Sequence, residues 1–519
     1  MESPSAGATN PPMTSHAIAA GHDLTAEAGA EILGAGGTAV DAAIAAAAMA
    51  MVVEPVLAGL LGGGFLMVRE PGGRCRCLDT FVQTPKAKRP EAELDFREVV
   101  ADFGTATQAF HIGAASVAAP GLALGLAEAH IRYGRMPFAD LLAPAIRAAR
   151  EGVTVTGFQA SLARIVAPIL KDTPAARALH APEGDLLGEG AHFANPALGD
   201  VLEVFGHEGP RFVQEGEVAA ALLSLMEAGG HLTRADLAAY RPAWREPVAI
   251  QRGGAAIALA PPPSLGGALI AFSLALMDQD PAPVDKALAF EMTDRARVEA
   301  ALDEDPAEGL QTLLAPGLIA RFRRELTGRP VASRGTTQIS VVDAEGIGAS
   351  LTLSNGEGCG TMVPGTGIMP NNMLGEEDLV PQGWHRWPVD RRLGSMMAPM
   401  AVTWPTGRMA MLGSGGSNRI RTALSQVLLG ILDRGLPLDE AIERPRLHVE
   451  GDGRRARLDA ETVDLLESDL AVLRRAYPEM TEWAARSMFF GGVHAVLRDA
   501  GGGVAAAGDP RRAGAVRIG

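Results

Sequence analysis

The sequence Gly335-Thr336-Thr337-Gln338 contains the residue types of a threonine nucleophile. A threonine hydroxyl attacks carbonyl groups poorly by itself, but a free α-amine on the same residue can take its proton. Such an amine has a pKa of about 8, so part of it is neutral near pH 7. Because an internal threonine has no free amine, the chain would have to be cut before Thr336. Attack of the Thr336 hydroxyl on the carbonyl of Gly335 would make that cut.

The flanking sequence suits a cut at this bond. Residues 327–335 are polar and contain Gly, Pro and Ser, which predicts an exposed linker. Residues 337–342 and 347–354 alternate on either side of a turn at residues 343–346, which predicts a β-hairpin. Gly-Thr pairs are also common in proteins without any catalytic role, so these residues alone leave a purely structural interpretation open.

A second glycine-rich segment, residues 413–418, follows a predicted hairpin at 396–412 and precedes a predicted helix. Backbone N–H groups at the start of a helix can bind an anion or a developing oxyanion. The backbone N–H groups of this segment are therefore candidates for an oxyanion hole. A plain tight turn between strand and helix explains the same residues equally well.

The elements that must position these residues are mostly helical in the first half of the chain. Thr38 and Asp41 form a capping-box pattern ahead of residues 39–53, whose apolar side chains all round predict a buried helix. Periodic apolar residues predict further helices at 121–133, 138–150, 218–228 and 284–297. The triple glycine at 62–64 leads into a predicted core strand and is either a tight turn or a ligand loop.

Composition excludes several classes of function. The chain has 519 residues and a net charge of −15, and only 4% of its residues are aromatic, which argues against a nucleic-acid partner. Its three cysteines form neither a disulfide framework nor a zinc pattern, and no cofactor or metal motif is present. The longest apolar run, residues 42–53, is too short to cross a membrane, and residues 1–12 do not resemble a signal peptide. We expect a cytoplasmic protein with no membrane partner.

Many segments, in order along nearly the whole chain, resemble the gamma-glutamyltranspeptidase family of N-terminal-nucleophile hydrolases. The matching segments include Gly36-Gly37-Thr38-Ala39-Val40-Asp41, Val53-Glu54-Pro55, Gly62-Gly63-Gly64-Phe65, Pro261-Pro262-Pro263-Ser264, Thr336-Thr337, Asn371-Asn372, Ser395-Met396, residues 413–420 and Asp509-Pro510-Arg511-Arg512. No single segment is decisive, but the ordered set is a specific signal.

The resemblance implies an α+β fold, a four-layer αββα sandwich. It also implies self-cleavage into a large subunit, residues 1–335, and a small subunit, residues 336–519, with Thr336 as nucleophile. Ser354, or alternatively Thr352, falls where the family places a hydroxyl bonded to the nucleophile. Asn355 corresponds to a nearby family asparagine that binds substrate. Gly415 and Gly416 match the oxyanion-hole glycines within a shift of one residue.

The sequence departs from the family where the substrate should be recognised. Phe81 stands where the family has an arginine for the α-carboxylate of the donor, and phenylalanine cannot replace a bidentate guanidinium. Glu376 or Asp378 could still bind an ammonium group. Of two paired serines, only Ser395 remains, because residue 394 is glycine.

These observations predict an autoprocessed enzyme similar to gamma-glutamyltransferases, an amidohydrolase or acyltransferase with altered donor specificity and no cofactor or metal. Its partners would be a small amide or peptide substrate and its own two fragments, as a heterodimer or a dimer of heterodimers. One alternative is an acylase that acts on a non-glutamyl amide. Another is an uncleaved, catalytically silent homologue that serves as a binding protein.

Overall fold

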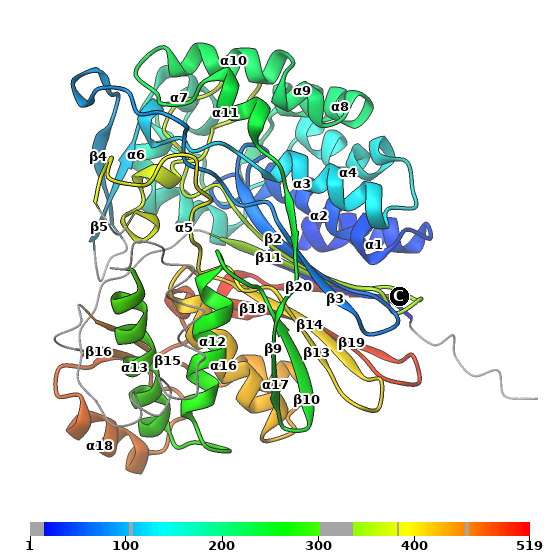
Figure 1. Cartoon of the computed structure of the whole chain (residues 1–519), viewed down its shortest axis with the longest axis vertical. Helices are drawn as coiled ribbons and strands as arrows, with labels where there is room; N and C mark the ends of the chain where they lie inside the picture. The colour runs from blue at the N-terminus through cyan, green and yellow to red at the C-terminus, as the bar shows by residue number, and fades with distance from the viewer. Residues whose placement is uncertain (1–14, 103–106, 302–335, 381–382, 452–455) are drawn as a thin grey trace, which may run out of the picture.

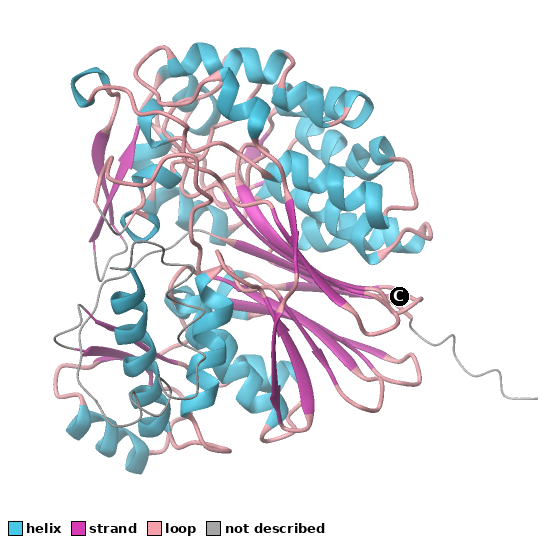
Figure 2. Ribbon diagram, viewed as in Figure 1, coloured by secondary structure: helices cyan, strands magenta, loops and turns pink. Residues whose placement is uncertain are grey.

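A computed structural model describes residues 15–102, 107–301, 336–380, 383–451 and 456–519. Two β-sheets are stacked face to face, with one helical layer above them and another below (Figure 1, Figure 2). The structure is therefore the four-layer αββα sandwich of N-terminal-nucleophile hydrolases, and the predicted fold class is confirmed. The predicted linker at 327–335 lies outside the described residues.

The upper sheet has seven strands in the order β20-β1-β11-β12-β2-β3-β8, and its described strand pairs are antiparallel. Its strands are β20 (Ala515–Ile518), β1 (Ala17–Ala20), β11 (Thr337–Val342), β12 (Gly348–Ser354), β2 (Gly63–Arg69), β3 (Cys75–Asp79) and β8 (Ala243–Arg245). The predicted hairpin after Thr336 is confirmed as β11 and β12. Its central position in the sheet places Thr336 at the middle of one sheet edge.

The lower sheet has six antiparallel strands in the order β19-β18-β14-β13-β10-β9. Its strands are β19 (Val504–Ala507), β18 (Gly492–Arg498), β14 (Met409–Gly415), β13 (Met400–Thr403), β10 (Ala255–Leu259) and β9 (Val248–Arg252). Residues 413–415, which the sequence predicts as loop, continue β14 instead, because Gly415 pairs with Gly492 of β18. The glycines allow the close approach of the upper sheet: a Cβ on Gly413 would lie 2.2 Å from the Gln338 amide oxygen.

Helices cover the outer faces of both sheets (Figure 1). Those on the upper side are α1 (Asp23–Gly34), α2 (Ala39–Val53), α3 (Leu122–Tyr133), α4 (Phe138–Glu151), α5 (Gly157–Ile165), α6 (Ala167–Leu170), α7 (Pro174–His180), α8 (Pro196–Glu208), α9 (Pro210–Gln214), α10 (Glu217–Met226) and α11 (Arg234–Ala239). Those on the lower side are α12 (Leu265–Leu276), α13 (Pro283–Ala301), α16 (Arg419–Leu432), α17 (Leu438–Glu443) and α18 (Glu467–Ala476). The buried helix predicted at 39–53 is confirmed as α2, capped by Thr38 and Asp41.

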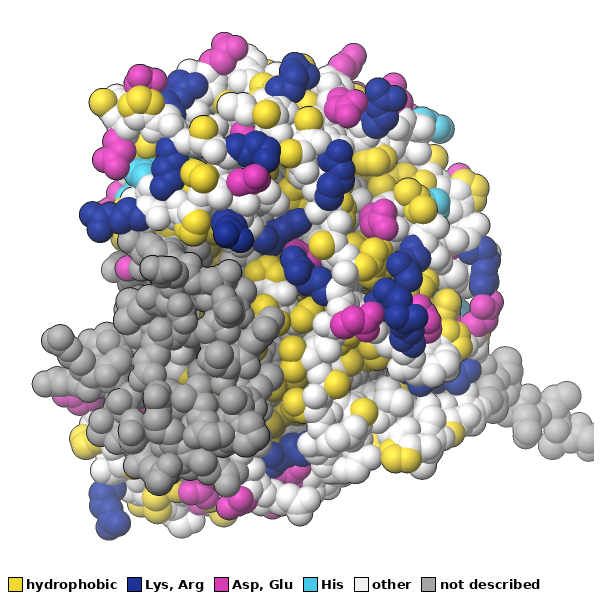
Figure 3. All heavy atoms as spheres, in the orientation of Figure 1, with side chains coloured by type: hydrophobic (Ala, Val, Ile, Leu, Met, Phe, Trp, Pro, Cys, Tyr) yellow, Lys and Arg dark blue, Asp and Glu magenta, His cyan; other side chains and the backbone are white. Residues whose placement is uncertain are grey.

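Shorter elements connect these layers. They are the strands β4 (Arg97–Asp102), β5 (Thr107–Ile112), β6 (Val153–Thr154), β7 (His192–Phe193), β15 (Leu447–Gly451), β16 (Ala456–Glu461) and β17 (Thr481–Trp483), and the 3-10 helices η1 (Glu91–Glu93), η2 (Ala114–Ser116), η3 (Met373–Gly375), η4 (Glu377–Leu379), η5 (Met488–Phe490) and η6 (Pro510–Arg512). On the face shown in Figure 3, Lys and Arg side chains are interspersed with Asp and Glu side chains. Within the described residues, no helix combines the length and apolar character that a membrane crossing requires.

The two faces of β11 have different surroundings. Ile339 and Val341 belong to the core shared with α2, whereas Gln338 and Ser340 face the lower sheet. The Ser340 hydroxyl donates to the His494 carbonyl of β18, at 2.9 Å, and so joins the two sheets. Alternation along a strand places Thr336 on the same face as Gln338, between the sheets, and Thr337 on the face toward α2.

Candidate active site

A cavity opens between the ends of β11 and β12 and the segment from 373 to 397, with about 420 Å³ of space when the solvent at its mouth is included. We call it the Ser354 cavity. Its lining residues are Phe81, Leu265, Thr336, Ser354, Met373, Glu376, Asp378, Leu379, Gly394, Ser395, Met396, Met397, Ser417 and Ile420. The structure thus brings most of the predicted site residues together in one place.

Thr336 is buried where the upper sheet begins, immediately before β11. Its carbonyl oxygen accepts a hydrogen bond from the Arg512 guanidinium, at 3.4 Å. Gly415 of the lower sheet passes so close that an added Cβ would lie 2.2 Å from the same carbonyl oxygen. The backbone of Thr336 is therefore held between a buried guanidinium and a glycine that cannot be enlarged without movement.

Ser354, rather than Thr352, shares the cavity with Thr336. Thr337 pairs with Leu353 in the ladder, and continuing this register by one residue sets Thr336 opposite Ser354. The Thr352 hydroxyl donates to the Gln338 amide oxygen, at 2.5 Å, deeper between the sheets. The Ser354 hydroxyl accepts the N–H of Gly356. Of the two hydroxyls that the sequence leaves open, Ser354 is the one next to the candidate nucleophile.

The Gly415–Gly416 backbone joins β14 to the segment that begins α16. Gly416 has φ of +119°, a backbone conformation that favours glycine, and an added Cβ would lie 2.7 Å from Gly491. α16 starts three residues later, at Arg419. Gly415 packs against Thr336 and both glycines precede α16, but neither is in the described lining of the Ser354 cavity. Their role in an oxyanion hole stays a prediction.

Buried ion pairs anchor the segment that carries Arg512, whose backbone N–H donates to the Asp509 carbonyl, at 3.1 Å. Asp509 pairs with Arg446, at 2.5 Å, and with Arg511, at 3.3 Å. Burial would raise the pKa of Asp509, but the two guanidinium groups outweigh it and keep that pKa below its usual range. Arg446 also donates to the carbonyl oxygens of residues 490 and 491, against which Gly416 packs. One network therefore positions both the group that holds Thr336 and the glycine segment beside it.

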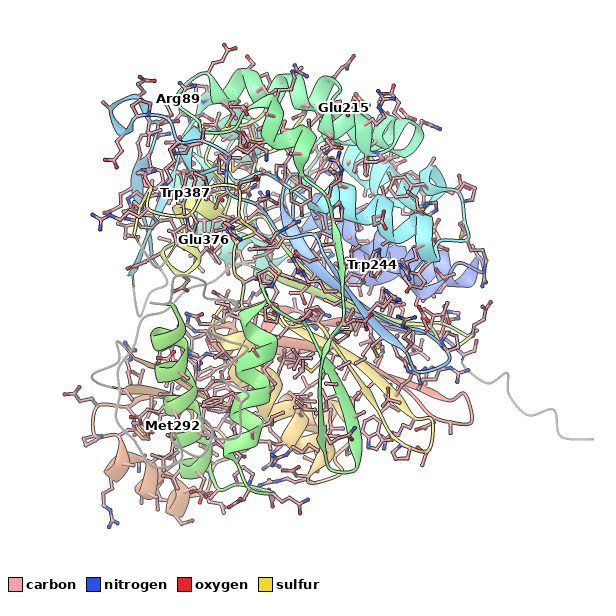
Figure 4. The ribbon with its side chains drawn as sticks, in the orientation of Figure 1. Arg89, Glu215, Trp244, Met292, Glu376 and Trp387 are labelled. Carbon is pink, nitrogen blue, oxygen red and sulfur yellow. The ribbon has the colours of Figure 1, made fainter. Side chains whose placement is uncertain are left out.

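The far wall of the cavity carries acidic side chains. Glu376 lies where the upper and lower halves of the molecule meet (Figure 4). Burial raises the pKa of Glu376 well above its usual range, and the nearby carboxylates of Glu357 and Asp378 raise it further. Asp378 accepts a hydrogen bond from Asn418, at 3.0 Å, and so is tied to the start of α16. A cationic group entering this wall would relieve the repulsion among these carboxylates.

Phe81 also lines the Ser354 cavity, together with the acidic side chains. Its ring stacks on Phe65, with 5.8 Å between the ring centres, and it is almost fully buried. Arg392 approaches it, but the Arg392 guanidinium donates to the Phe81 carbonyl, at 2.6 Å, and lies over the Tyr240 ring. Asp79 is a further partner of Arg392, at 3.7 Å. This guanidinium supports the backbone of Phe81 and is not among the residues that line the cavity.

The basic residues close to Phe81 in sequence pair elsewhere. Arg74 and Arg76 lie near Glu246, at 3.4 and 3.8 Å, and Lys86 pairs with Asp390, at 2.8 Å. Among the described residues that line the Ser354 cavity there is no lysine or arginine. No residue in that lining takes over the charge of the missing arginine.

Two predicted substrate-binding residues have different positions. Ser395 lines the cavity, and its hydroxyl accepts the N–H of Met397, at 3.1 Å. Asn355 is absent from the described lining. Its side-chain amide donates to the Met369 carbonyl, at 3.0 Å, and packs against Gly59.

Sequence reasoning assigned no role to Glu54 or Arg512, although both lie in segments that matched the family. Both are buried beside Thr336 and Thr337. A charged residue at the end of an otherwise apolar helix was the signal for Glu54, since an ionisable side chain is rarely buried without a partner. The described residues contain no group of three or more His, Cys, Asp or Glu side chains that could hold a metal ion.

Comparisons with known proteins identify the relatives of this chain. The family profile described as Gamma-glutamyltranspeptidase matches residues 25–518. The chain is 31% identical over 462 residues to an acylase ACY 1 proenzyme of Pseudomonas sp. (strain V22), covering 84% of this chain and 82% of that protein. It is 30% identical over 472 residues to a glutathione hydrolase proenzyme of Pseudomonas aeruginosa, covering 83% of this chain and 82% of that one.

A solved structure shows the same architecture. The crystal structure of cephalosporin acylase from Bacillus halodurans superposes with a TM-score of 0.81 at 25% identity, covering all of this chain and 99% of that one. The sequence and structure comparisons thus include both acylases and glutathione hydrolases.

Proposed function

The chain belongs to the gamma-glutamyltranspeptidase family and is a hydrolase or acyltransferase, and from that premise we propose that Thr336 is its nucleophile after self-cleavage at Gly335–Thr336. The uncut chain is then a zymogen. Cleavage divides it into residues 1–335 and 336–519, which remain associated through the shared sheets. The names of both curated relatives include the word proenzyme, which supports a processing step.

The cleavage needs only the chain and water. The Thr336 hydroxyl oxygen attacks the Gly335 carbonyl carbon, the C–N bond breaks, and the nitrogen of Thr336 takes up the hydroxyl proton. Water then hydrolyses the resulting ester, which frees the Gly335 carboxylate and restores the hydroxyl. The product carries the α-amine that Thr336 needs as its base.

Turnover repeats the same chemistry on a donor amide. The α-amine takes the proton of the Thr336 hydroxyl, whose oxygen attacks the donor carbonyl and forms an acyl-enzyme ester. The leaving amine departs with the proton, and water or an acceptor amine then removes the acyl group. The backbone N–H groups of Gly415 and Gly416 stabilise the oxyanion in this proposal, as the close packing of Gly415 on Thr336 supports.

We further propose that the donor lacks the α-carboxylate of a γ-glutamyl group. The observation that carries this proposal is the charge of the cavity: its described lining has the carboxyl groups of Glu376 and Asp378 and no cation. A donor carboxylate would find no cation in this lining and would add to the repulsion that already raises the pKa of Glu376, whereas an amine-bearing or neutral acyl group would not. The similarity to an acylase supports the same direction.

Two measurements test the proposal. The intact mass of purified protein should show two fragments that begin at residues 1 and 336, and the Thr336→Ala variant should remain one chain. A panel of anilides then compares γ-glutamyl with neutral and amine-bearing acyl donors on the processed protein. A single uncut chain without activity would support a silent binding protein instead, and best turnover of the γ-glutamyl anilide would overturn the proposed specificity.

A further inference from the structure

A second cavity lies on the other side of Thr336. We call it the Glu54 cavity; among the described residues, Thr336 alone lines both this cavity and the Ser354 cavity. Its polar lining comes from Glu54, Thr337, Gln338, His494 and Arg512, together with the backbones of Gly21 and Gly415. These side chains contact the start of β11 from the face opposite the proposed substrate.

Glu54 is the central group of this cavity. Its carboxyl oxygens accept hydrogen bonds from the Thr337 hydroxyl, at 2.9 Å, and from the Thr25 hydroxyl, at 3.2 Å. A Cβ on Gly21 would lie 2.8 Å from both the Glu54 carboxyl and the Thr337 hydroxyl. This glycine therefore keeps the contact between the large and small subunits of the proposed enzyme close.

The position of Glu54 opposes its negative charge. It is buried at the C-terminal end of α2, where the partial charge of the helix is also negative. Burial raises the pKa of Glu54 to about 7, although Thr337, Thr25 and Arg512 favour the charged form. The folded chain keeps a proton that an unfolded chain would release, so this residue destabilises the fold as pH rises toward 7. Buried groups with this property are typical of functional sites.

The remaining titratable groups facing Glu54 are a guanidinium and a neutral imidazole. Burial lowers the pKa of Arg512 to about 10, so it stays charged at pH 7, and it holds the Thr336 carbonyl. Burial lowers the pKa of His494 to about 4. The His494 Nδ1 accepts the N–H of Asp509, at 3.3 Å, so in the neutral ring the proton is on Nε2. Near pH 7, Glu54 is therefore the side chain of this cavity whose charge changes, and the α-amine that cleavage would give Thr336 is a second titrating group.

We infer that Glu54 is a positioning residue for the nucleophile, acting through the Thr337 hydroxyl together with the hold of Arg512 on the Thr336 carbonyl. The inference rests on the proposed role of Thr336. Thr336 precedes the first residue of β11, so its place depends on these two contacts rather than on the strand ladder alone. A displacement of about 1 Å at a reacting group can reduce turnover by about 10²-fold.

The test compares kcat, KM and their pH dependence for wild type, Glu54→Gln, Thr337→Val and Thr337→Ser. Glu54→Gln keeps an acceptor for Thr337 but cannot ionise, so kcat should fall by about tenfold or more with KM changed less than about twofold. In a plot of log kcat/KM against pH, the slope on the acidic side should also decrease from two toward one, because one ionising group is removed. Slower self-cleavage of the folded variant supports the inference as well, since cleavage uses the same hydroxyl.

The two Thr337 variants keep the test decisive if Glu54→Gln does not fold. Thr337→Val should lower kcat, and Thr337→Ser, which retains the hydroxyl, should restore most of it. Asp236→Asn is the matched control, because Asp236 is also buried and accepts a threonine hydroxyl, from Thr233 at 2.6 Å, and neither residue is in the described lining of the two cavities. Its pH profile should equal that of wild type.

Two results would overturn the inference: wild-type kcat and slope in folded Glu54→Gln, or equal kcat in Thr337→Val and Thr337→Ser. Failure of the proposed function has a different signature. If Thr336→Ala is still cut and active, Thr336 is not the nucleophile, whatever the Glu54 variants do.

Discussion

The two walls of the Ser354 cavity are built differently. One wall lies at the ends of β11 and β12, where strand ladders hold Thr336 and Ser354 and where Gly415 of β14 packs against the Thr336 carbonyl. The facing wall comes from residues 373–397, where two 3-10 helices and their loops carry Glu376 and Asp378. Rigid sheet edges suit reacting groups, and loops tolerate substitution. The proposed chemistry can therefore be kept in this fold while the acyl-binding side chains change.

Removing the nucleophile tests the sheet-built wall with the largest expected effect. Thr336→Ala lacks the attacking hydroxyl, so the chain should stay uncut and turnover should fall by at least about 10⁴-fold. Intact mass and an anilide assay measure both. Thr337→Ala is the comparison variant: its hydroxyl bonds Glu54 on the opposite face, so it should impair cleavage much less. Normal cleavage of Thr336→Ala would show that another group attacks.

Enlarging Gly415 tests the same wall with an intermediate effect. The added methyl of Gly415→Ala would lie 2.2 Å from the Thr336 carbonyl oxygen. Either Thr336 or the Gly415 backbone must therefore shift. Turnover should fall by about 10²–10³-fold, the loss typical of one oxyanion contact. Gly34→Ala is the control, since nothing lies within 4 Å of its added Cβ.

Gly416→Pro should be at least as damaging as Gly415→Ala. Proline removes the N–H and requires φ near about −65°, whereas Gly416 has φ of +119°. Wild-type turnover in either folded variant would place the oxyanion hole elsewhere.

Changing Phe81, which follows β3 and lines the same cavity, tests the recognition of the acyl donor. γ-Glutamyl donors should be poorer than neutral or amine-bearing donors by about 10- to 100-fold in kcat/KM, because a charge-assisted bidentate contact is missing. Phe81→Arg should raise γ-glutamyl turnover and lower that of the other donors. The donor panel measures the ratio for both proteins. An unchanged ratio in Phe81→Arg would mean that another residue holds the donor.

The smallest effect concerns pH. Burial and its acidic neighbours raise the pKa of Glu376, so rising pH ionises it at values where an exposed glutamate is already charged. The KM of an amine-bearing donor should therefore decrease as pH rises, by up to about tenfold, until the donor amine itself loses its proton. Glu376→Gln should remove this dependence. Glu377→Gln, an exposed neighbour outside the cavity lining, should retain it.

Local sequence patterns were enough to predict the helices and strands around the site. The Thr38–Asp41 capping box and a run of apolar residues define α2, and alternation after Thr336 defines β11 and β12. These patterns depend on backbone preferences and on side chains a few residues apart, so they can be read without knowing the rest of the fold. The four-layer architecture followed from the family resemblance, not from these patterns.

The contacts between residues far apart in the sequence could be identified only from the tertiary structure. Ser354 rather than Thr352 reaches Thr336 because register sets the pairing, and 413–415 joined a strand because Gly492 lies beside it. The Glu54–Thr337 contact joins residues 283 apart in the chain, and no local pattern encodes such a distance. Contacts of this kind depend on how separate layers pack, and burial then sets the pKa of the side chains they enclose. That is why Thr336 could be proposed as the nucleophile from the sequence, whereas the carboxyl group beside Thr337 could not.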